Sequence, residues 1–241
     1  MSIIHHNQLM NKYQHYSFDL WLTLIRSNPS FKRERTKFFF DHFNQRQKTL
    51  EEVERIFRRI DVMTNAINEK TGGNIDTDTL HLMVISEMND HEYDFDTVDL
   101  QALYDEMEAL VLQHRPVVYC SATAGVLRAL HQRQNCTLSL LSNTAFIKGR
   151  TLRKVLQELE LDQYLHFQLY SDETGMSKPN PEMFRLMLGS VANTRNGEAV
   201  QPQQIIHIGD NVKADIKGAS EAGIHSLLVN SNNQCISSLL N

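Results

Sequence analysis

The second half of the chain alternates short apolar runs rich in β-forming residues with longer stretches of helical periodicity. The predicted strands are TLSLLS at 137–142, LHFQLYS at 165–171, IIHIG at 205–209 and HSLLV at 225–229. Helices are predicted between them at about 148–160, from Pro181 onward and around 213–222. Strands and helices that alternate in this way form a parallel sheet with crossover helices. The pattern therefore predicts an α/β fold.

One further strand candidate lies far upstream of the others. It is YQHYSFD at 13–19, and Asp19 occupies its carboxyl end. Parallel strands that are distant in sequence pair through long crossover connections. We therefore expect this segment to join the same sheet, with a large insertion between it and the later strands.

The insertion is predicted to be almost wholly helical, over about 28–114. Two sets of apolar residues recur there at helical spacing: Val53, Ile56, Phe57, Ile60, Met63 and Ile67, and Leu100, Leu103, Tyr104, Met107 and Leu110. Ser27-Asn28-Pro29 and Arg115-Pro116 mark its ends, and Gly72-Gly73-Asn74 is expected to turn the chain within it. The predicted organisation is a core of 1–27 and 115–241 and a helical bundle of 28–114.

Composition and charge exclude several classes of function. With 241 residues and 41% hydrophobic residues the chain is long enough to form a globular core. Its net charge of −5 offers no basic excess, so a nucleic-acid partner is not expected. The chain lacks GxGxxG, GxxxxGK, GxSxG and HExxH patterns, which leaves the commonest nucleotide-binding, serine-hydrolase and zinc-protease classes without support.

Location and redox state follow from similar observations. No apolar run is long enough to cross a bilayer, and the first residues lack the apolar stretch of a secretory signal. We therefore expect a cytoplasmic protein without a membrane partner. Cys120, Cys136 and Cys235 show no CxxC spacing, so they are predicted to be ordinary thiols and neither disulfide partners nor zinc ligands.

Candidate functional residues lie at the carboxyl ends of the predicted strands, where open α/β sheets bind their ligands. They are Asp19 after the first strand, Ser142 and Asn143 after the second, Lys178 after the third, and Asp210 with Asp215 after the fourth. Each of these alone is typical of a helix cap or a turn. Their order and their positions at successive strand ends indicate one shared site.

The same residues resemble the motifs of the haloacid dehalogenase-like hydrolase superfamily. The matching stretches are FDLWLTL (18–24), LSLLSN (138–143), MSKPNPEMF (176–184) and IIHIGDNVKADIKGASEAGI (205–224). The resemblance implies a doubly wound parallel sheet, a Rossmann-like core, with an inserted α-helical bundle as a cap over the active site.

The chemistry of these residue types agrees with the resemblance. A carboxylate such as Asp19 can attack phosphorus or an activated carbon and form a covalent intermediate that water later releases. Mg²⁺ prefers carboxylate oxygens, which Asp19, Asp210 and Asp215 supply. Lys178 adds a compact positive charge, and the Ser142 hydroxyl can bind an oxygen of the transferred group. The resemblance implies these roles for the same positions.

The chain departs from the family pattern next to the nucleophile. Family phosphatases usually carry a second Asp two residues after the first, as general acid and base, and Trp21 stands there. In the family this position gives the metal a backbone carbonyl, which Trp21 still offers. Leu22 stands where a small or polar residue is common, and Thr23 is in its usual place. Trp21, Thr23 and Asn143 are expected to border the substrate.

Three functions remain open on these residues. The first is a Mg²⁺-dependent phosphatase acting on a small, phosphorylated and hence anionic metabolite. The second is a 2-haloacid dehalogenase, which an aromatic residue at position 21 resembles and whose halide leaves without a proton. The third is a binding protein that keeps the fold with little turnover. The retained acidic motif of Gly209, Asp210 and Asp215 favours the phosphatase, because the true dehalogenases lack it. Neither substrate identity nor the number of subunits follows from the sequence.

Overall fold

A five-stranded parallel sheet forms the centre of the protein, whose computed structural model describes residues 12–195 and 200–240. Its strands are β1 (His15–Phe18), β4 (Thr137–Ser142), β5 (Phe167–Tyr170), β6 (Ile205–Gly209) and β7 (His225–Leu228), in the order β5-β4-β1-β6-β7. All four pairings are parallel. The predicted α/β class is confirmed, and the upstream strand joins the sheet as expected, where it takes the central position. Residues 1–11 of the amino-terminal stretch 1–14, where no secretory signal is expected, lie outside the described residues.

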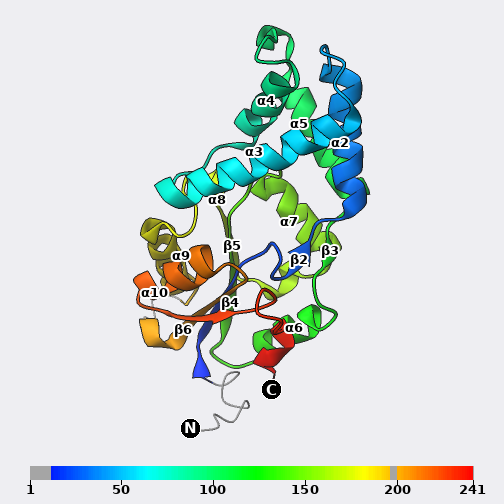
Figure 1. Cartoon of the computed structure of the whole chain (residues 1–241). Helices are drawn as coiled ribbons and strands as arrows, with labels where there is room; N and C mark the ends of the chain where they lie inside the picture. Colours follow the sequence, from blue (N-terminus) through cyan, green and yellow to red (C-terminus); the bar gives the residue numbers. More distant parts are fainter. Residues whose placement is uncertain (1–11, 196–199, 241) are drawn as a thin grey trace.

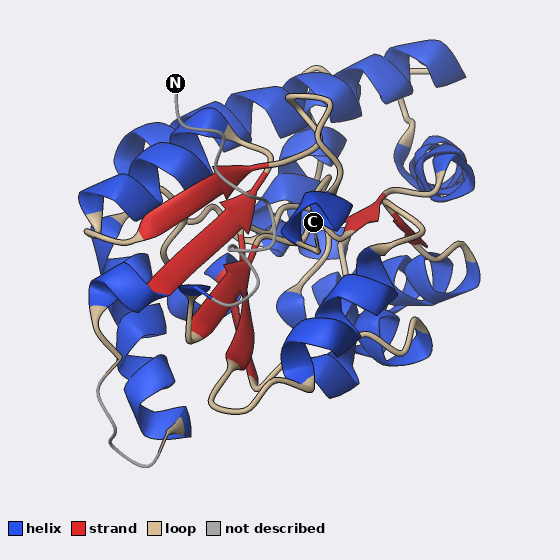
Figure 2. Ribbon diagram, turned by 90° about the horizontal axis from the view of Figure 1, so that it is seen from below, coloured by secondary structure: helices blue, strands red, loops and turns tan. Residues whose placement is uncertain are grey.

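Helices connect the strands and cover both faces of the sheet (Figures 1 and 2). Those of the core are α6 (Thr123–His131), α7 (Gly149–Glu158), α8 (Ser171–Thr174), α9 (Pro181–Thr194) and α10 (Gly218–Glu221), which follows a π-helical turn at Val212–Lys217. Short 3₁₀ turns lie at Asp162–Tyr164, Pro202–Gln204 and Ile236–Leu239. The helix expected from Pro181 begins there, with Asn180 capping it through a hydrogen bond to the N–H of Glu182.

The two faces of the sheet bury different sets of side chains, because successive residues of a strand point to opposite sides. Leu138 and Leu140 of β4 pack with α6 and α7, whereas Leu141 packs with α9 and α10. The α9 face also buries polar groups: His15 bonds to Thr137 and Ser139 through its two ring nitrogens. This polar layer continues along the sheet toward the carboxyl ends of the strands.

The residues between β2 (Ile25–Arg26) and β3 (Val117–Val118) are mostly helical, and these two short strands pair antiparallel at the base of the insertion. The inserted helices are α2 (Pro29–Phe43), α3 (Leu50–Thr71), α4 (Thr77–Met88) and α5 (Leu100–Gln113), with a 3₁₀ turn at Phe95–Thr97. As predicted, the chain turns after α3, where Gly72 takes the left-handed conformation at φ 74°.

The apolar pattern of the insertion is confirmed in part. Val53, Ile56, Phe57 and Ile60 are buried in a cluster shared with α4 and α5. Met63, Ile67 and Leu100 lie in helices as predicted but outside that cluster, since they are 41%, 40% and 36% exposed. Beyond Ile60 the buried face of α3 carries polar groups, Thr64 and Asn68, because α3 leaves the other inserted helices there and passes over the core.

The inserted helices lie against the carboxyl-end edge of the sheet through several polar contacts. Glu69 of α3 accepts a hydrogen bond from the side chain of Asn211 (3.1 Å) and pairs with Lys213 (3.0 Å). Thr77 of α4 donates to the carbonyl of Ala145 (2.7 Å). Both contacts reach loops that follow β6 and β4. The insertion therefore covers the edge where the candidate residues gather.

Two further findings bear on the sequence predictions. Cys120 and Cys235 form a disulfide with a Cα–Cα distance of 6.8 Å, so the prediction of three unpaired thiols is wrong for this pair, while Cys136 is free and buried. The two cysteines are 115 residues apart in sequence, and only the fold brings them together.

Among the described residues no helix is long and apolar enough to span a bilayer.

Candidate active site

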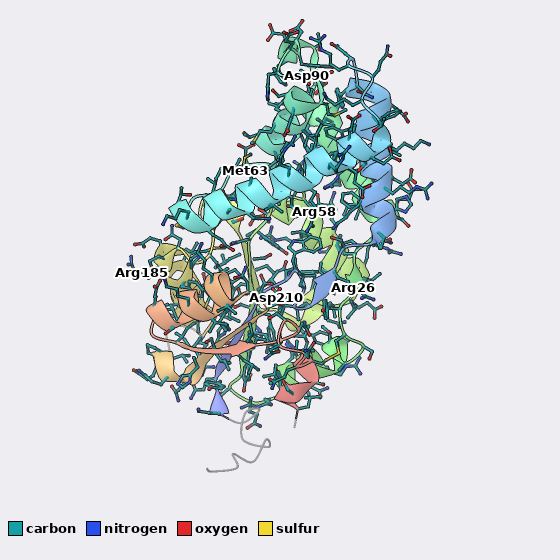
Figure 3. All side chains as sticks on the ribbon, viewed as in Figure 1. Arg26, Arg58, Met63, Asp90, Arg185 and Asp210 are labelled. Atoms are coloured by element: carbon teal, nitrogen blue, oxygen red, sulfur yellow. A yellow bond between two sulfur atoms is a disulfide. The ribbon has the colours of Figure 1, made fainter. Side chains whose placement is uncertain are left out.

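The carboxyl ends of β1, β4 and β6 bring the candidate residues to one place. Asp19 follows β1, Ser142 ends β4, and Asp210 follows β6, and these three strands are neighbours in the sheet. In Figure 3 Asp210 lies at the upper side of the core, below the helix that carries Arg58 and Met63. α3 thus lies on the side of the sheet edge that carries the site, where Glu69 contacts Asn211.

Three carboxylates form the centre of the site. Asp19, Asp210 and Asp215 can each offer one oxygen such that the three atoms lie within 4.8 Å of one another. Asp19 is 7% exposed and Asp215 is 1% exposed, so water screens this cluster poorly. Carboxylates brought this close need cations beside them.

Lys178 is the cation that the chain itself provides. Its Nζ lies 2.7 Å from Asp19 Oδ1 and 2.7 Å from Asp215 Oδ1, and the residue is 1% exposed. The ammonium group therefore bridges two carboxylates in a nearly closed environment. Loss of the ammonium group would leave both of these carboxylates buried without their cation.

Burial and charge give the three carboxyl groups different proton affinities. Burial raises the pKa of Asp19 to about 7, and the charge of Lys178 opposes this only in part. Burial, with the charge of Asp215, raises the pKa of Asp210 to about 6. Burial also acts on Asp215, but Lys178 and His207 outweigh it and hold the pKa of Asp215 below its ordinary value. Asp215 is hence the group that stays ionised. A further cation would stabilise the ionised forms of Asp19 and Asp210.

Asp215 is held from three sides. Its Oδ1 accepts a hydrogen bond from His207 Nε2 (3.0 Å) besides that from Lys178, and its Oδ2 accepts one from the N–H of Asn211 (3.0 Å). A Cβ at Gly209 would lie 2.2 Å from the Asp215 carboxyl carbon. Gly209 is therefore required because the Asp215 side chain fills the space that a side chain at position 209 would occupy.

His207 is a residue of this site that the sequence analysis missed. It is fully buried in β6, and burial lowers the pKa of its ring, which is therefore neutral. Its Nδ1 lies 3.0 Å from the hydroxyl of Ser17 in β1. The Nδ1 of the neutral ring can accept a hydrogen bond from that hydroxyl while its Nε2–H donates to Asp215. The available signal was a histidine within the otherwise apolar strand IIHIG.

The loop after β1 orients Asp19. Thr23 donates its hydroxyl proton to Asp19 Oδ2 at 3.0 Å and is fully buried. Leu22 lies in the left-handed region at φ 58° and is 50% exposed, which explains why residues without a bulky side chain suit this position. Trp21 is half-buried and packs against the main apolar cluster, and no described donor bonds to its backbone carbonyl.

The residues after β4 serve the loop that carries Lys178. The Asn143 side chain donates to the carbonyl of Lys178 (2.9 Å) and accepts from its N–H (2.7 Å). Ser142 is fully buried, and its hydroxyl donates to the carbonyl of Asn143 (3.1 Å). Asn143 thus positions Lys178 through the backbone, and the predicted contacts of Ser142 and Asn143 with substrate stay predictions.

A model of the haloacid dehalogenase-like hydrolases matches residues 13–223. The chain belongs to this family. The match includes every residue of the site described above, from Ser17 to Asp215. Its members are hydrolases, which agrees with a buried carboxylate cluster at the strand ends.

This haloacid dehalogenase-like hydrolase is similar over part of its length to several characterised proteins. It is 31% identical over 113 residues to the rhythmically expressed gene 2 protein of Drosophila melanogaster, covering 46% of this chain and 40% of that one. It is 29% identical over 117 residues to phosphoserine phosphatase of Thermus thermophilus, covering 48% and 42%. It is 28% identical over 106 residues to glyceraldehyde 3-phosphate phosphatase of Methanopyrus kandleri, covering 44% and 42%. The matched stretches span less than half the length of these relatives.

The whole fold of this haloacid dehalogenase-like hydrolase is shared with solved structures. The HAD-hydrolase YfnB from Bacillus subtilis, solved bound to magnesium, superposes with a TM-score of 0.68 at 18% identity, over 93% of this chain and 92% of that one. A 2-haloacid dehalogenase from Pseudomonas syringae superposes with a TM-score of 0.60 at 20% identity, over 92% and 88%. These similarities include the inserted helices and establish the architecture.

Proposed function

We propose that this protein is a Mg²⁺-dependent phosphohydrolase that uses Asp19 as its nucleophile on a small phosphorylated metabolite. The observation that carries the proposal is the cluster of Asp19, Asp210 and Asp215 around Lys178. Two of the similar proteins are phosphatases of small metabolites, which supports the same reaction here. The substrate is anionic because a phosphate ester carries negative charge at neutral pH.

The donor set fits a divalent cation. When all three carboxyl groups are ionised, they and the Lys178 ammonium group carry a net charge of −2, because His207 is neutral. The Asp210 carboxylate receives a hydrogen bond from its own backbone N–H and from no other described residue, which leaves its lone pairs available. Asp19, Asp210, Asp215 and the Trp21 carbonyl are the oxygens that would hold Mg²⁺. Bound there, Mg²⁺ would offset the negative charge of the nucleophile and of the transferred group.

The described residues support a two-step reaction. Asp19, held by Thr23 and Lys178, attacks phosphorus, and the bond from phosphorus to the ester oxygen breaks. The alkoxide that leaves takes a proton from water, because no acid stands at position 21. A second water molecule then splits the acyl phosphate, which releases inorganic phosphate and regenerates the Asp19 carboxylate. Lys178 places a positive charge beside the oxygen that attacks, which lowers the repulsion between two anions.

Trp21 is the residue that supports the alternative function, a dehalogenase. Its indole cannot give a proton to a leaving alkoxide, whereas a halide needs none. The three-carboxylate cluster favours the phosphohydrolase, because halide displacement from carbon has no need of a second and third carboxylate. A protein that binds phosphorylated ligands with little turnover is the third possibility, and leaving-group dependence separates it from the first.

We also propose that residues 28–114 act as a cap over this site, with 1–27 and 115–241 as the core. The contact of Glu69 with Asn211, next to Asp210, supports this role, since α3 then closes the open side of the site. A closed cap excludes water and selects the part of the substrate beyond the phosphoryl group.

Mg²⁺ is expected to raise the melting temperature of the wild type by mass action, because the cation binds the folded carboxylate cluster and not the unfolded chain. At a concentration about 100 times its dissociation constant, the gain would be about 2.7 kcal/mol. The measurement is a thermal melt with Mg²⁺ against EDTA, with Asp210→Ala in parallel. A wild-type melting temperature that Mg²⁺ does not change, and that equals the melting temperature of Asp210→Ala, would contradict the metal site.

Trp21→Asp is expected to raise hydrolysis of phosphate esters with poor leaving groups, because a carboxyl group at this position can protonate the leaving alkoxide. A tenfold gain corresponds to about 1.4 kcal/mol of transition-state stabilisation. Esters of activated phenols should gain less, since a phenolate leaves with little help. The half-buried indole also packs against the core, so melting temperature must be measured with rate. A folded variant with no gain on any ester would count against a phosphatase site that lacks only its acid.

A further inference from the structure

Arg35 of α2 is a buried cation that the site described so far does not use. It is 9% exposed, and its guanidinium lies over three aromatic rings: 4.0 Å from the ring centre of Phe57, 4.7 Å from that of Phe146 and 5.5 Å from that of Phe31. Burial lowers the pKa of Arg35 to about 10, so the group stays charged at neutral pH. The positive charge is therefore held in a fixed place by aromatic faces.

No described residue accepts a hydrogen bond from this guanidinium or forms an ion pair with it, and its Nε is buried without a partner. Asp61 is the carboxylate whose charge acts on it, but no ion pair joins the two. Buried guanidinium groups are ordinarily paired with a carboxylate or a phosphate, because ring faces replace only part of the lost hydration. A guanidinium group that is nine-tenths buried, with its Nε closed to water and without an acceptor, indicates that an anion belongs beside Arg35.

His81 of α4 provides a second unpartnered donor at the same place. It is 1% exposed, its Nε2 is buried without a hydrogen-bond partner, and its ring packs 5.6 Å from that of Phe146. Burial, together with the charges of Arg35 and Lys148, lowers its pKa to about 3, so the ring is neutral. A neutral imidazole can donate one N–H to an anion that the guanidinium binds.

Phe146 connects this place with the active site. It belongs to the core, four residues after Ser142 at the end of β4, yet its ring packs in the cluster of the inserted helices. The strand that carries Asp19, β1, is the neighbour of β4, and both strands end at the same edge. Arg35 and His81 therefore meet the core on the active-site edge of the sheet, at the junction of core and insertion.

We propose that Arg35, with His81 beside it, binds a second anionic group of the substrate, a carboxylate or a further phosphoryl group, apart from the phosphoryl group that Asp19 attacks. The proposal rests on the proposed phosphohydrolase function and specifies its substrate class. The planar guanidinium matches either group through two parallel hydrogen bonds. The substrate is thus a phosphorylated acid or a bisphosphate, with its second charge in the junction between α2, α4 and the loop after β4.

The test compares matched esters with and without the second charge. 3-Phosphoglycerate and glycerol 3-phosphate differ by a carboxylate, and fructose 1,6-bisphosphate and fructose 6-phosphate differ by a phosphoryl group. We expect the wild type to hydrolyse either 3-phosphoglycerate or fructose 1,6-bisphosphate faster than its partner without the second charge. The preferred ester shows whether the second group is a carboxylate or a phosphoryl group. Arg35→Met should then lower kcat/KM for that member by about 10- to 100-fold, chiefly through KM, because hydrogen bonds to a charged group are lost. The singly charged partner should lose far less, whereas a purely structural role would weaken both alike.

Lys37→Met is the matched control, because Lys37 lies on the same helix, is exposed, and forms no hydrogen bond or ion pair with a described residue. The substitution removes one positive charge at a position away from the junction. The ratio of kcat/KM between the two esters of each pair should therefore stay at the wild-type value. Arg35→Lys serves if Arg35→Met fails to fold: it keeps the charge, loses the paired hydrogen bonds, and should show the same loss of preference to a smaller degree.

Binding to Asp19→Asn separates this inference from the proposed function. Calorimetry with 3-phosphoglycerate and with fructose 1,6-bisphosphate should show weaker binding when Arg35→Met is added. Should the wild type hydrolyse none of the four esters while this binding difference is found, the phosphohydrolase proposal fails and the Arg35 site stands. Should the esters be hydrolysed with no preference for a second charge, or should Arg35→Met leave all binding unchanged, the Arg35 site is overturned and the proposed function stands.

Discussion

Asp19→Asn is expected to lower turnover of any hydrolysed substrate by a factor on the order of 10⁵ or more, as removal of a nucleophile does in other covalent enzymes. The amide is neutral and cannot attack phosphorus, and the neighbouring hydroxyl groups have other bonds: Thr23 donates to Asp19 itself and Ser142 donates to the Asn143 carbonyl. The fold should survive, because three carboxylates crowd one lysine and a neutral amide of the same shape relieves that crowding. Steady-state rates and a melting curve measure both effects.

Asp41→Asn is the control for this variant, since Asp41 is exposed on α2 and the substitution changes the charge equally. It should keep the wild-type rate when both proteins are purified in the same way. Wild-type turnover in a contamination-free preparation of Asp19→Asn would show that Asp19 forms no covalent intermediate. The site would then serve binding or activate water directly.

The strands and the main site residues could be predicted because both leave local signals. Four apolar runs and one upstream run marked the sheet, and the strands β4 and β6 have the predicted bounds of 137–142 and 205–209. A polar residue directly after such a run lies at the edge where parallel strands end, so Asp19 and Asp210 could be placed together before any contact was known.

Residues that act through contacts distant in sequence could not be predicted. His207 lies on a buried strand, and its role depends on Ser17 and Asp215, which only the register of β1 with β6 and the turn after β6 bring to its two nitrogens. Arg35 had the pattern of a solvated helix face, because it follows Lys32 and Arg33 in a charged run. Its burial results from Phe57 and Phe146, which come from another helix and from the core.

The network from Ser17 through His207, Asp215 and Lys178 to Asp19 joins the sheet interior to the proposed nucleophile. Each link holds the next in one orientation, since every hydrogen-bonding atom along it is used. Lys178 is the central link, because it alone touches both carboxylates. A change at this residue should therefore affect stability and catalysis together.

Lys178→Met is expected to lower the free energy of unfolding by about 3–5 kcal/mol without Mg²⁺, because two carboxylates that are nearly closed to water would lose their shared cation. The loss should depend on pH. In the wild type, the lowered pKa of Asp215 stabilises the folded protein at pH values above 3.8, the ordinary pKa of an aspartate. This stabilisation is lost as the pH falls through the lowered pKa. In the variant, burial without the cation would raise the pKa of both carboxyl groups, so its stability should fall as pH rises through their raised pKa values. The deficit relative to wild type should thus be larger at pH 8 than at pH 5.

Urea unfolding at both pH values, with EDTA and then with Mg²⁺, measures this deficit. Lys213→Met is the control, because Lys213 is about half exposed and pairs with Glu69 at the surface, where such a pair contributes at most about 1 kcal/mol. Mg²⁺ should return part of the lost stability to Lys178→Met, since a second cation can approach the same carboxylates, while activity should stay low because the charge beside the attacking oxygen is missing. A deficit that is equal at pH 5 and pH 8, and no larger than that of Lys213→Met, would mean that the Asp19 and Asp215 carboxyl groups do not depend on Lys178 for their charge.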